Sequence, residues 1–346
     1  MTLVSNLNSK QIVTAAKMLE SGRLVAFPTE TVYGIGADAE NPAAVRQLFA
    51  LKGRPPDRPV SICVSRDVDL SYWASDIPPV VHDLITCFWP GPLTLVLKKS
   101  CHVLDLVSRG KASVALRCPS HPLAMALLAT FKCGQGGIAA PSANKSGHVS
   151  PTTAEHVKSE FGLDEKLSLI LDGGACDWGI ESTILDLSAL DTKGAFILRS
   201  GVITAAQIAE VLNRYQITLH EKHSSSVEKH YAPVTPAIML SIEEIHRIPM
   251  MQQLSIKVAF LVHTESLSNQ LKKHFSPESV ICLPNVPQGF SQHFYAALRK
   301  LDLSCVDCIL IEAVPSLQYW KAVYDRIMGA IQFSQEKKAV LFPELN

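Results

Sequence analysis

The sequence lacks an excess of charge of either sign, and it has no long apolar run. Lys and Arg together number 32, and so do Asp and Glu, so no overall electrostatic field draws the chain onto nucleic acid or an anionic membrane. The longest mostly apolar stretch, residues 84–97, is interrupted by Trp89-Pro90-Gly91-Pro92 and is too short to span a bilayer. The amino-terminal segment has neither a basic start nor a continuous apolar stretch, which argues against a signal peptide. We therefore expect a soluble, cytoplasmic protein that does not bind a membrane.

The usual signatures of covalent and zinc-dependent catalysis are also missing. No Walker loop, GxSxG nucleophile elbow or HExxH motif occurs. Nine cysteines are scattered along the chain, which fits reduced thiols better than a disulfide framework. Cys305 and Cys308 have the CxxC spacing, but no second pair or nearby His pair completes a metal site, and residues 306–314 resemble a buried strand. We therefore assign this pair to the core and predict no metal held by protein side chains.

The length of 346 residues exceeds what one hydrophobic core usually supports, which predicts two domains. Strand-like runs alternate with capped helical runs through the first two hundred residues, and the strands outnumber the helices. This pattern predicts a mixed, twisted open α/β sheet. Residues 213–236 are polar and rich in Ser and Pro, which indicates a linker. A β-α-β-α-β-α order beyond it predicts a small parallel three-layer domain. The predicted boundaries are 1–212, 213–236 and 237–346.

Several elements are predicted from periodicity and capping residues. Helices are expected at 9–20, 79–88, 122–131, 153–161 and 205–215, and another begins at Pro42. Strands are expected at 24–27, 60–64, 93–97, 113–116, 137–140, 167–171, 183–187 and 195–198. The segment PTETVYGIGADA, residues 28–39, holds two glycines and is predicted to be a turn-rich loop.

The first candidate site is the KGRP segment, residues 52–55, together with Arg58. Three cations there follow a helix end and precede a strand. A solvated helix cap and an anion-binding loop both explain the cations. Prolines at positions 55, 56 and 59 favour the anion-binding loop, because a stiff loop loses less entropy when it holds a ligand. We expect Lys52 and Arg54 to be exposed.

The second candidate site is the PSAN segment, residues 141–144, which follows a strand and precedes a helix. Its small residues, hydroxyls and backbone amides suit a phosphate, although ordinary turn chemistry is an alternative reading. Arg117 and Arg199 each close an apolar strand run, where a charge is costly unless it faces a ligand or partner. The two arginines therefore suggest a surface that binds a carboxylate or a phosphate.

Taken jointly and in order, eight segments resemble the YrdC-type threonylcarbamoyl-AMP synthase family: FPTETVYGIGADA, KGRPPDRP, FWPGPLTLVL, VALRCPSHP, IAAPSANKSGHVSPT, LDGG, GIESTILDL and ILRSG. The later segments HYAPVTP, AALRKLD, VDCILIEAVP and YDRI resemble the two-domain version, which has a smaller Rossmann-like C-terminal domain. The resemblance implies an enzyme that joins L-threonine, bicarbonate and ATP into L-threonylcarbamoyladenylate, releasing pyrophosphate and water. That reaction is the first step of tRNA N6-threonylcarbamoyladenosine formation.

The resemblance also implies roles for individual residues. The threonine carbamate attacks the α-phosphorus, so the protein supplies positioning and charge stabilisation, with Mg²⁺ bound through the ATP phosphates. The expected catalytic residues are Lys52, Arg54, Ser142 and Asn144. The expected ATP-binding residues are Arg54, Arg58, Ser113, Ser142, Ser150, Arg199 and Tyr231. The expected threonine-binding residues are Thr31, Cys63, Arg117, Ala140 and Ser182. Many members of the family have His where this chain has Cys63.

Two other functions stay open at this point, an RNA-binding module and a carbamoyl-transfer accessory protein. Zero net charge and the lack of a basic, aromatic stripe disfavour RNA as the direct substrate. The lack of zinc-finger or acylphosphatase-like segments disfavours the accessory protein. The resemblance implies that a tRNA threonylcarbamoyl transferase complex receives the product, so tRNA is a partner only indirectly.

Overall fold

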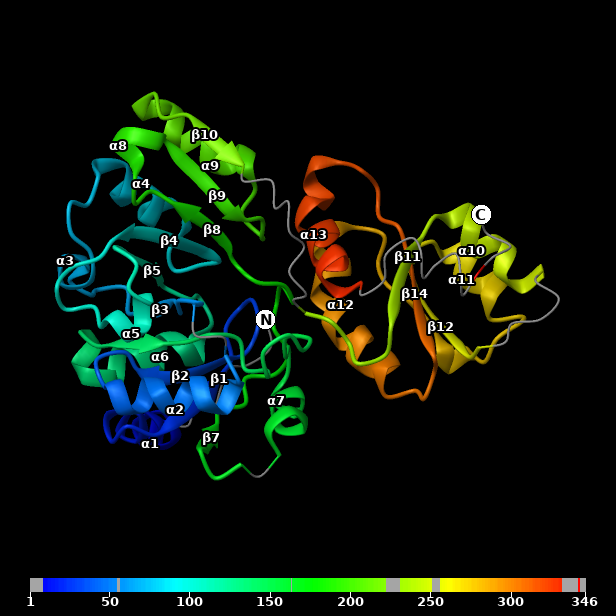
Figure 1. The fold of residues 1–346 in the computed structure, drawn as a ribbon, viewed down its shortest axis with the longest axis horizontal. Helices are drawn as coiled ribbons and strands as arrows, with labels where there is room; N and C mark the ends of the chain where they lie inside the picture. The colour runs from blue at the N-terminus through cyan, green and yellow to red at the C-terminus, as the bar shows by residue number, and fades with distance from the viewer. Residues whose placement is uncertain are drawn as a thin grey trace. The chain divides into compact units, whose positions relative to one another are not determined.

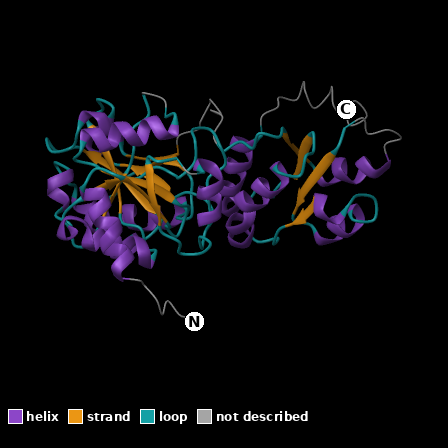
Figure 2. Cartoon of the chain, turned by 90° about the horizontal axis from the view of Figure 1, so that it is seen from below, coloured by secondary structure: helices purple, strands orange, loops and turns teal. Residues whose placement is uncertain are grey.

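The computed structural model describes residues 9–54, 57–162, 164–221, 231–250, 256–331 and 342. It divides into two compact units (Figure 1). The first unit comprises residues 1–146, 151–177 and 181–223, and the second comprises 147–150, 178–180 and 224–346. Each unit has its own sheet, with helices packed beside the strands (Figure 2). Within the described residues, no helix is long and apolar enough to cross a membrane.

The first unit contains a mixed ten-stranded sheet in the described residues, in the order β10-β9-β8-β4-β5-β3-β6-β2-β1-β7. Its strands are β1 (Leu24–Phe27), β2 (Gly34–Asp38), β3 (Ile62–Val64), β4 (Leu93–Lys98), β5 (Ser113–Arg117), β6 (Gly137–Ala139), β7 (Leu167–Ile170), β8 (Thr183–Asp186), β9 (Ala195–Arg199) and β10 (Leu219–Glu221). Parallel and antiparallel pairs both occur. The predicted mixed α/β sheet is therefore confirmed.

Helices of the first unit cover both faces of one half of this sheet. They are α1 (Ser9–Glu20), α2 (Pro42–Lys52), α3 (Leu70–Trp73), α4 (Pro79–Phe88), α5 (Asp105–Ser108), α6 (Pro122–Thr130), η1 (Phe131–Gly134), α7 (Ala154–Phe161), α8 (Leu190–Lys193), α9 (Ala205–Leu212) and η2 (Asn213–Tyr215). One core joins α2, α4, α7 and α9 to one face of the sheet. A second core joins α1 and α6 to β1, β3 and β6 on the opposite face.

The other half of that opposite face, formed by β5, β4, β8 and β9, is more open. In β5 the side chains alternate: Val114 and Leu116 are buried, whereas Ser113 and Ala115 are half-buried. Neighbouring strands show the same alternation, and residues paired across strands lie on the same face. This half of the sheet therefore presents a row of accessible positions on which a site can be built.

The segment 28–39 is not entirely the loop that its glycines predict, because part of it forms β2. This strand pairs antiparallel with β1 on one side and with β6 on the other. Gly36 explains the discrepancy, since a Cβ there would lie 2.6 Å from Ile138 Cγ2 and 3.0 Å from Phe27 Cε1. Gly36 is therefore required for close packing in the core, and it does not form a turn.

The second unit is a smaller parallel α/β domain. Its sheet runs in the order β11-β14-β12-β13, and all three strand pairs are parallel. Its strands are β11 (Ala237–Leu240), β12 (Val258–Val262), β13 (Val280–Cys282) and β14 (Cys308–Glu312). Its helices are α10 (Ile242–Arg247), η3 (Ile248–Met250), α11 (Glu265–Leu271), η4 (Pro277–Ser279), α12 (Pro287–Asp302), η5 (Gln318–Trp320) and α13 (Lys321–Ala330). The predicted three-layer domain is confirmed, with one strand more than expected.

Two local predictions need correction. Residues 213–221, placed in the linker from their composition, form η2 and β10, and β10 pairs with β9. Residues 222–230 of that linker lie outside the described residues. Of the CxxC pair, Cys308 is buried in β14 as expected, but Cys305 is exposed, because β14 begins only at Cys308.

Replacing Gly36 by Ala should destabilise the chain by about 1 to 3 kcal/mol, because the added methyl group meets the fully buried Ile138 and Phe27. Chemical denaturation monitored by circular dichroism would measure the change. Gly34→Ala is the matched control in the same strand, since its Cβ would come no closer than 3.5 Å to a neighbour. Equal unfolding free energies for the two variants would contradict this account of β2.

Candidate active site

The KGRP segment begins at the carboxyl end of α2, whose ends are well defined. The Asn41 side chain accepts hydrogen bonds from Ala43 N and Ala44 N at the start of the helix. Gly53 ends it in the left-handed conformation, with φ of 57°. These two caps fix where Lys52 stands, on the last turn of the helix.

Lys52 is buried, with only 3% of its surface exposed, so the expectation of an exposed cation is wrong. Its Nζ donates hydrogen bonds to the carbonyl oxygens of Ser142 and Asn144, both in the PSAN segment. The Lys52 carbonyl in turn accepts from Ser146 N at 2.8 Å. The two candidate segments, far apart in the sequence, are thus tied together by one residue.

Burial lowers the pKa of Lys52 from 10.5 to about 7, and the nearby positive charge of Arg54 acts in the same direction. The two carbonyl oxygens accept hydrogen bonds from the amine in either protonation state. The lysine therefore changes its charge close to neutral pH in the free protein, and a phosphate nearby would favour the charged form.

Arg54 and Arg58 lie in the loop that follows. The Arg54 guanidinium folds back onto its own loop, donating to Arg58 O at 3.2 Å and to Pro59 O at 2.5 Å. Both arginines are half-buried. Pro55 and Pro56, expected to stiffen the loop, lie outside the described residues.

The PSAN segment runs beside the start of β2. Ile35 N donates to Pro141 O at 3.0 Å, Ala143 N donates to Tyr33 O at 2.8 Å, and Ser142 forms an isolated bridge with Gly34. The loop before β2 and the PSAN segment therefore lie side by side. Thr31, in that loop, is fully buried, and its Oγ1 lies 2.8 Å from Thr29 Oγ1.

Arg117 ends β5 and is 8% exposed. Its Nη2 lies 2.8 Å from Oε1 of Glu30, a buried carboxylate in the loop between β1 and β2. Cys63 of β3 is paired with Arg117 in the sheet register, and burial raises the pKa of its thiol to about 11. The thiol is therefore neutral and cannot replace a basic imidazole.

Ala140 lies just beyond the end of β6 and is half-buried. Its backbone N donates a hydrogen bond to Ser61 O at 2.9 Å.

Ser182 and Arg199 meet on the open half of the sheet. Arg199 donates from Nε to Ser182 O at 3.0 Å and from Nη2 to Ser182 Oγ at 3.1 Å. The same Ser182 hydroxyl lies 2.8 Å from Thr94 Oγ1 of β4. Thr94 and Arg117 are on adjacent, antiparallel strands, so this group continues the site from β5 to β9.

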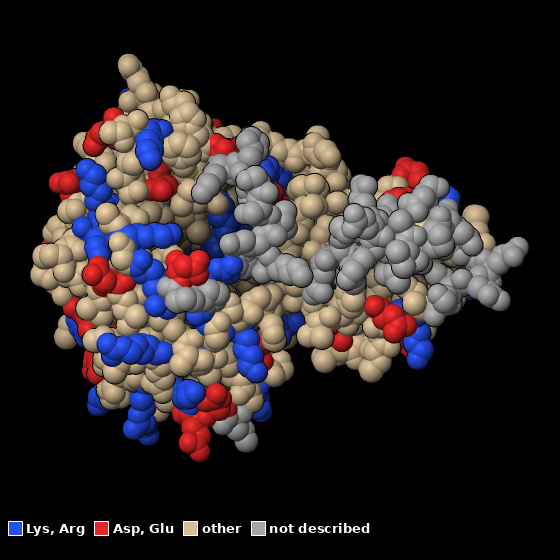
Figure 3. Space-filling view, viewed as in Figure 1, with Lys and Arg blue, Asp and Glu red and all other residues tan. Residues whose placement is uncertain are grey.

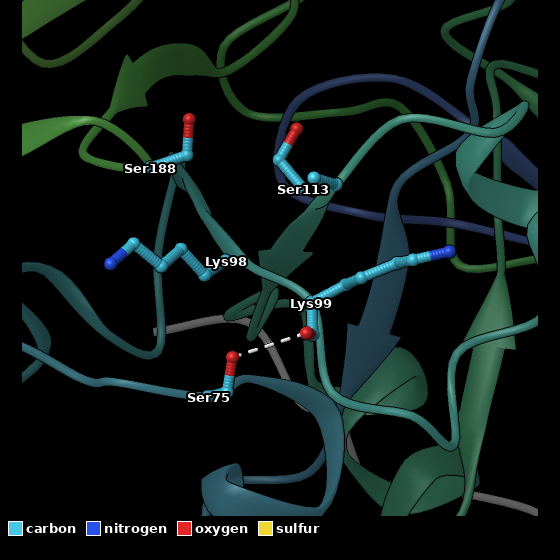
Figure 4. A pocket seen from close by; sticks show the side chains of 6 residues that line it. Ser75, Lys98, Lys99, Ser113 and Ser188 are labelled. Carbon is cyan, nitrogen blue, oxygen red and sulfur yellow. Dashed lines mark hydrogen bonds between the residues drawn. The ribbon is translucent and has the colours of Figure 1, made fainter.

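Ser113 lies on the same strand as Arg117, four residues away, or roughly 13 Å along it. It lines a separate cavity of about 410 Å³ with Ser75, Lys98, Lys99, Ala112 and Ser188 (Figure 4). Figure 3 shows that Lys and Arg side chains gather around a hollow in the first unit. Ser113 lies on the accessible half of the sheet, but no contact among the described residues joins it to the other predicted site residues.

Ser150 and Tyr231 belong to the second unit. Ser150 is fully buried. The Tyr231 ring centroid lies 5.7 Å from that of Tyr295, and Arg326 Cζ lies 5.6 Å from the same ring. Tyr231 has a φ of 69°, an uncommon conformation for a residue with a side chain.

Two family models together match most of the chain. A family model named for Sua5, YciO and YrdC proteins, and described as telomere recombination, matches residues 17–201. A second model, described as the threonylcarbamoyl-AMP synthase C-terminal domain, matches residues 203–330. The chain belongs to the threonylcarbamoyl-AMP synthase family.

Relatives in this family match most of the chain. The threonylcarbamoyl-AMP synthase of Pyrococcus abyssi is 34% identical over 95% of this chain and 98% of its own, and that of Bacillus subtilis is 38% identical over 93% of each. A putative threonylcarbamoyl-AMP synthase of Mycobacterium tuberculosis is 37% identical over 59% of this chain and 90% of its own. The crystal structure of P. abyssi Sua5 complexed with L-threonine superposes with a TM-score of 0.81 at 33% identity, covering 93% of this chain and 94% of that one.

Two residues of the site were not singled out from the sequence. Glu30 was seen only as part of a loop, although it is the one acidic residue in PTETVYG. Thr94 was seen only as part of a strand, although a hydroxyl in an apolar run such as LTLVL needs a partner. In both cases the sequence shows a polar group where burial is expected, but it does not show the partner.

The lowered pKa of Lys52 predicts a specific pH dependence of stability. Between pH 7 and 10.5 the unfolded chain holds a proton on this lysine that the folded chain has released, so stability should rise with pH. The slope approaches about 1.4 kcal/mol per pH unit. Urea denaturation of wild type and Lys52→Met from pH 7 to 8.5 would isolate this contribution as the difference between the two slopes. Parallel slopes would show that Lys52 keeps an ordinary pKa.

Proposed function

We propose that the chain condenses L-threonine, bicarbonate and ATP into L-threonylcarbamoyladenylate, pyrophosphate and water. The match to threonylcarbamoyl-AMP synthases over nearly the whole chain supports the reaction. The single structural observation that carries it is the contact of Lys52 with the backbone of Ser142 and Asn144, which unites the two segments expected to hold the nucleotide.

The nucleotide half of the site is formed by the KGRP and PSAN segments. Lys52, Arg54 and Arg58 offset the negative charge of the triphosphate, and Ser142 and Asn144 contribute hydrogen-bonding groups beside them. Family resemblance assigns Arg199, Ser113, Ser150 and Tyr231 to ATP binding as well. In the described part of the chain, no group of three or more His, Cys, Asp or Glu residues could hold a metal ion. Magnesium bound through the phosphate oxygens of ATP would supply further charge neutralisation.

The amino-acid half of the site is formed around Arg117. A guanidinium can bind a carboxylate through two parallel hydrogen bonds, which suits Arg117 to the carboxylate of threonine. Ser182, directly before β8, supplies a buried hydroxyl beside Thr94 of the neighbouring strand, and Thr31 supplies another from the loop before β2. Cys63 and Ala140 offer small, uncharged surfaces. These small and hydroxyl-bearing groups suit the hydroxyethyl side chain of threonine.

The chemistry needs no nucleophile from the protein. The amine of threonine takes up carbon dioxide from bicarbonate to give a carbamate, whose oxygen attacks the α-phosphorus as pyrophosphate leaves. The chain's contribution is to hold the carbamate and the phosphate in line and to stabilise the charge that develops on the phosphate oxygens. The product is passed to a tRNA threonylcarbamoyl transferase complex, so the cytoplasm, where ATP and tRNA are found, is the compartment we propose.

The purified chain should release pyrophosphate from ATP and Mg²⁺ only when threonine and bicarbonate are both present. A coupled pyrophosphate assay, together with chromatographic detection of the adenylate, would measure this. ATP turnover that is indifferent to threonine would contradict the proposal and favour an RNA-binding module or a carbamoyl-transfer accessory protein instead.

Arg54→Ala should lower kcat/KM for ATP by about a hundredfold, as expected when a charge-assisted contact to the triphosphate is lost. Lys145→Ala is the matched control, because Lys145 is an exposed cation directly after the PSAN segment and has no assigned role. Its kcat/KM should stay within about twofold of wild type. Similar losses in both variants would show that general positive charge, and not the KGRP loop, attracts the nucleotide.

A further inference from the structure

The ion pair between Glu30 and Arg117 is the most deeply buried one among the described residues of the first unit. Glu30 is 1% exposed, and one of its carboxylate oxygens is in an ion pair whereas the other accepts a backbone hydrogen bond. Oε1 lies 2.8 Å from Arg117 Nη2, and Oε2 accepts a hydrogen bond from Ser120 N at 3.1 Å. Arg117 Nε points to Gly91 O at 3.4 Å. The carboxylate is fixed by the backbone, and it fixes the guanidinium in turn.

The thiols close to the pair add no charge to it. The nearby thiols of Cys63 and Cys118 stay protonated, because burial raises their pKa values to about 11 and about 12. Glu30 and Arg117 together carry no net charge. A buried pair of this kind accepts a ligand of zero net charge at little electrostatic cost, whereas an added polyanion would leave negative charge without compensation.

We propose that Glu30 is the specificity-determining and positioning residue of the amino-acid half of the site. Its carboxylate aims Arg117 at the carboxylate of an amino acid, and it cancels the charge of Arg117 so that phosphate groups do not occupy this half. The KGRP loop offers its cations to the triphosphate, whereas Arg117 is already paired. The inference rests on the proposed function, because it presupposes that threonine and ATP bind in the same site.

Calorimetric titration of the full chain with threonine, with and without inorganic phosphate at constant ionic strength, tests this proposal. In wild type, phosphate should leave the Kd for threonine within about twofold. Glu30→Gln should weaken threonine binding by about 10- to 100-fold, because Arg117 loses the negative charge that is paired with it. In this variant added phosphate should weaken threonine binding further, because Arg117 is no longer neutralised.

Glu30→Asp separates the two parts of the proposal, since it keeps the charge but withdraws the carboxylate from Arg117. Threonine binding should weaken in this variant and remain insensitive to phosphate. Asp38→Asn is the matched control for a purely structural role. Asp38 is 5% exposed and is paired with Lys132 at 2.8 Å, yet it belongs to no part of the proposed site. This variant should bind threonine as wild type does.

Wild-type affinity for threonine in Glu30→Gln would overturn the proposal. So would weakened binding that does not respond to phosphate, because a merely structural loss has that result. If Glu30→Gln does not fold, competition between phosphate and threonine in wild type, or in Glu30→Asp, would still overturn it. If wild type does not bind threonine at all, the proposed function fails together with this proposal. If wild type binds threonine but the variants behave otherwise than expected, only the role of Glu30 fails.

Discussion

The arrangement of the site depends on one buried amine held against two backbone carbonyl oxygens. Lys52 reaches Ser142 and Asn144 only because α2 ends where Gly53 takes up its left-handed conformation. Without that contact, the PSAN segment would be joined to the rest of the sheet mainly through its neighbours in β2 and β6. Burial out of water disfavours the charged form of this amine, and its pKa is lowered for that reason. The residue therefore supports the loop, and we propose that its charge responds to a bound nucleotide.

The remainder of the site follows from the way the sheet is covered. Helices α1 and α6 protect β1, β3 and β6 on one face, but β5, β4, β8 and β9 are left accessible there. Polar groups at the ends of these strands, including Arg117, Thr94 and Ser182, consequently lie next to one another although they come from distant parts of the chain. A mixed sheet makes this arrangement easy, because antiparallel neighbours bring the start of one strand beside the end of the next.

Much of this architecture could be predicted from the sequence, and the failures have physical reasons. Capping residues and apolar periodicity located α1 and α4 with the bounds that the structure shows. Strand β2 was missed because its glycines serve packing and not turning. Lys52 was expected to be exposed, since a helix end with a lysine usually faces water. The link between Glu30 and Arg117 could not be predicted, because local patterns do not reveal which strand ends meet. The family resemblance named most candidate residues, but only coordinates show their partners.

The division of the chain into units has a consequence for its modularity. The second unit includes two short loops that come from the first two hundred residues, 147–150 and 178–180. Gly179 approaches α12 so closely that a Cβ would lie 2.4 Å from Ser291 O, and Arg299 of the same helix donates a hydrogen bond to Val149 O. A fragment ending at residue 212 would retain these loops but lose the helix against which they pack. Removing the second unit would therefore expose the surface of these loops that α12 covers in this chain.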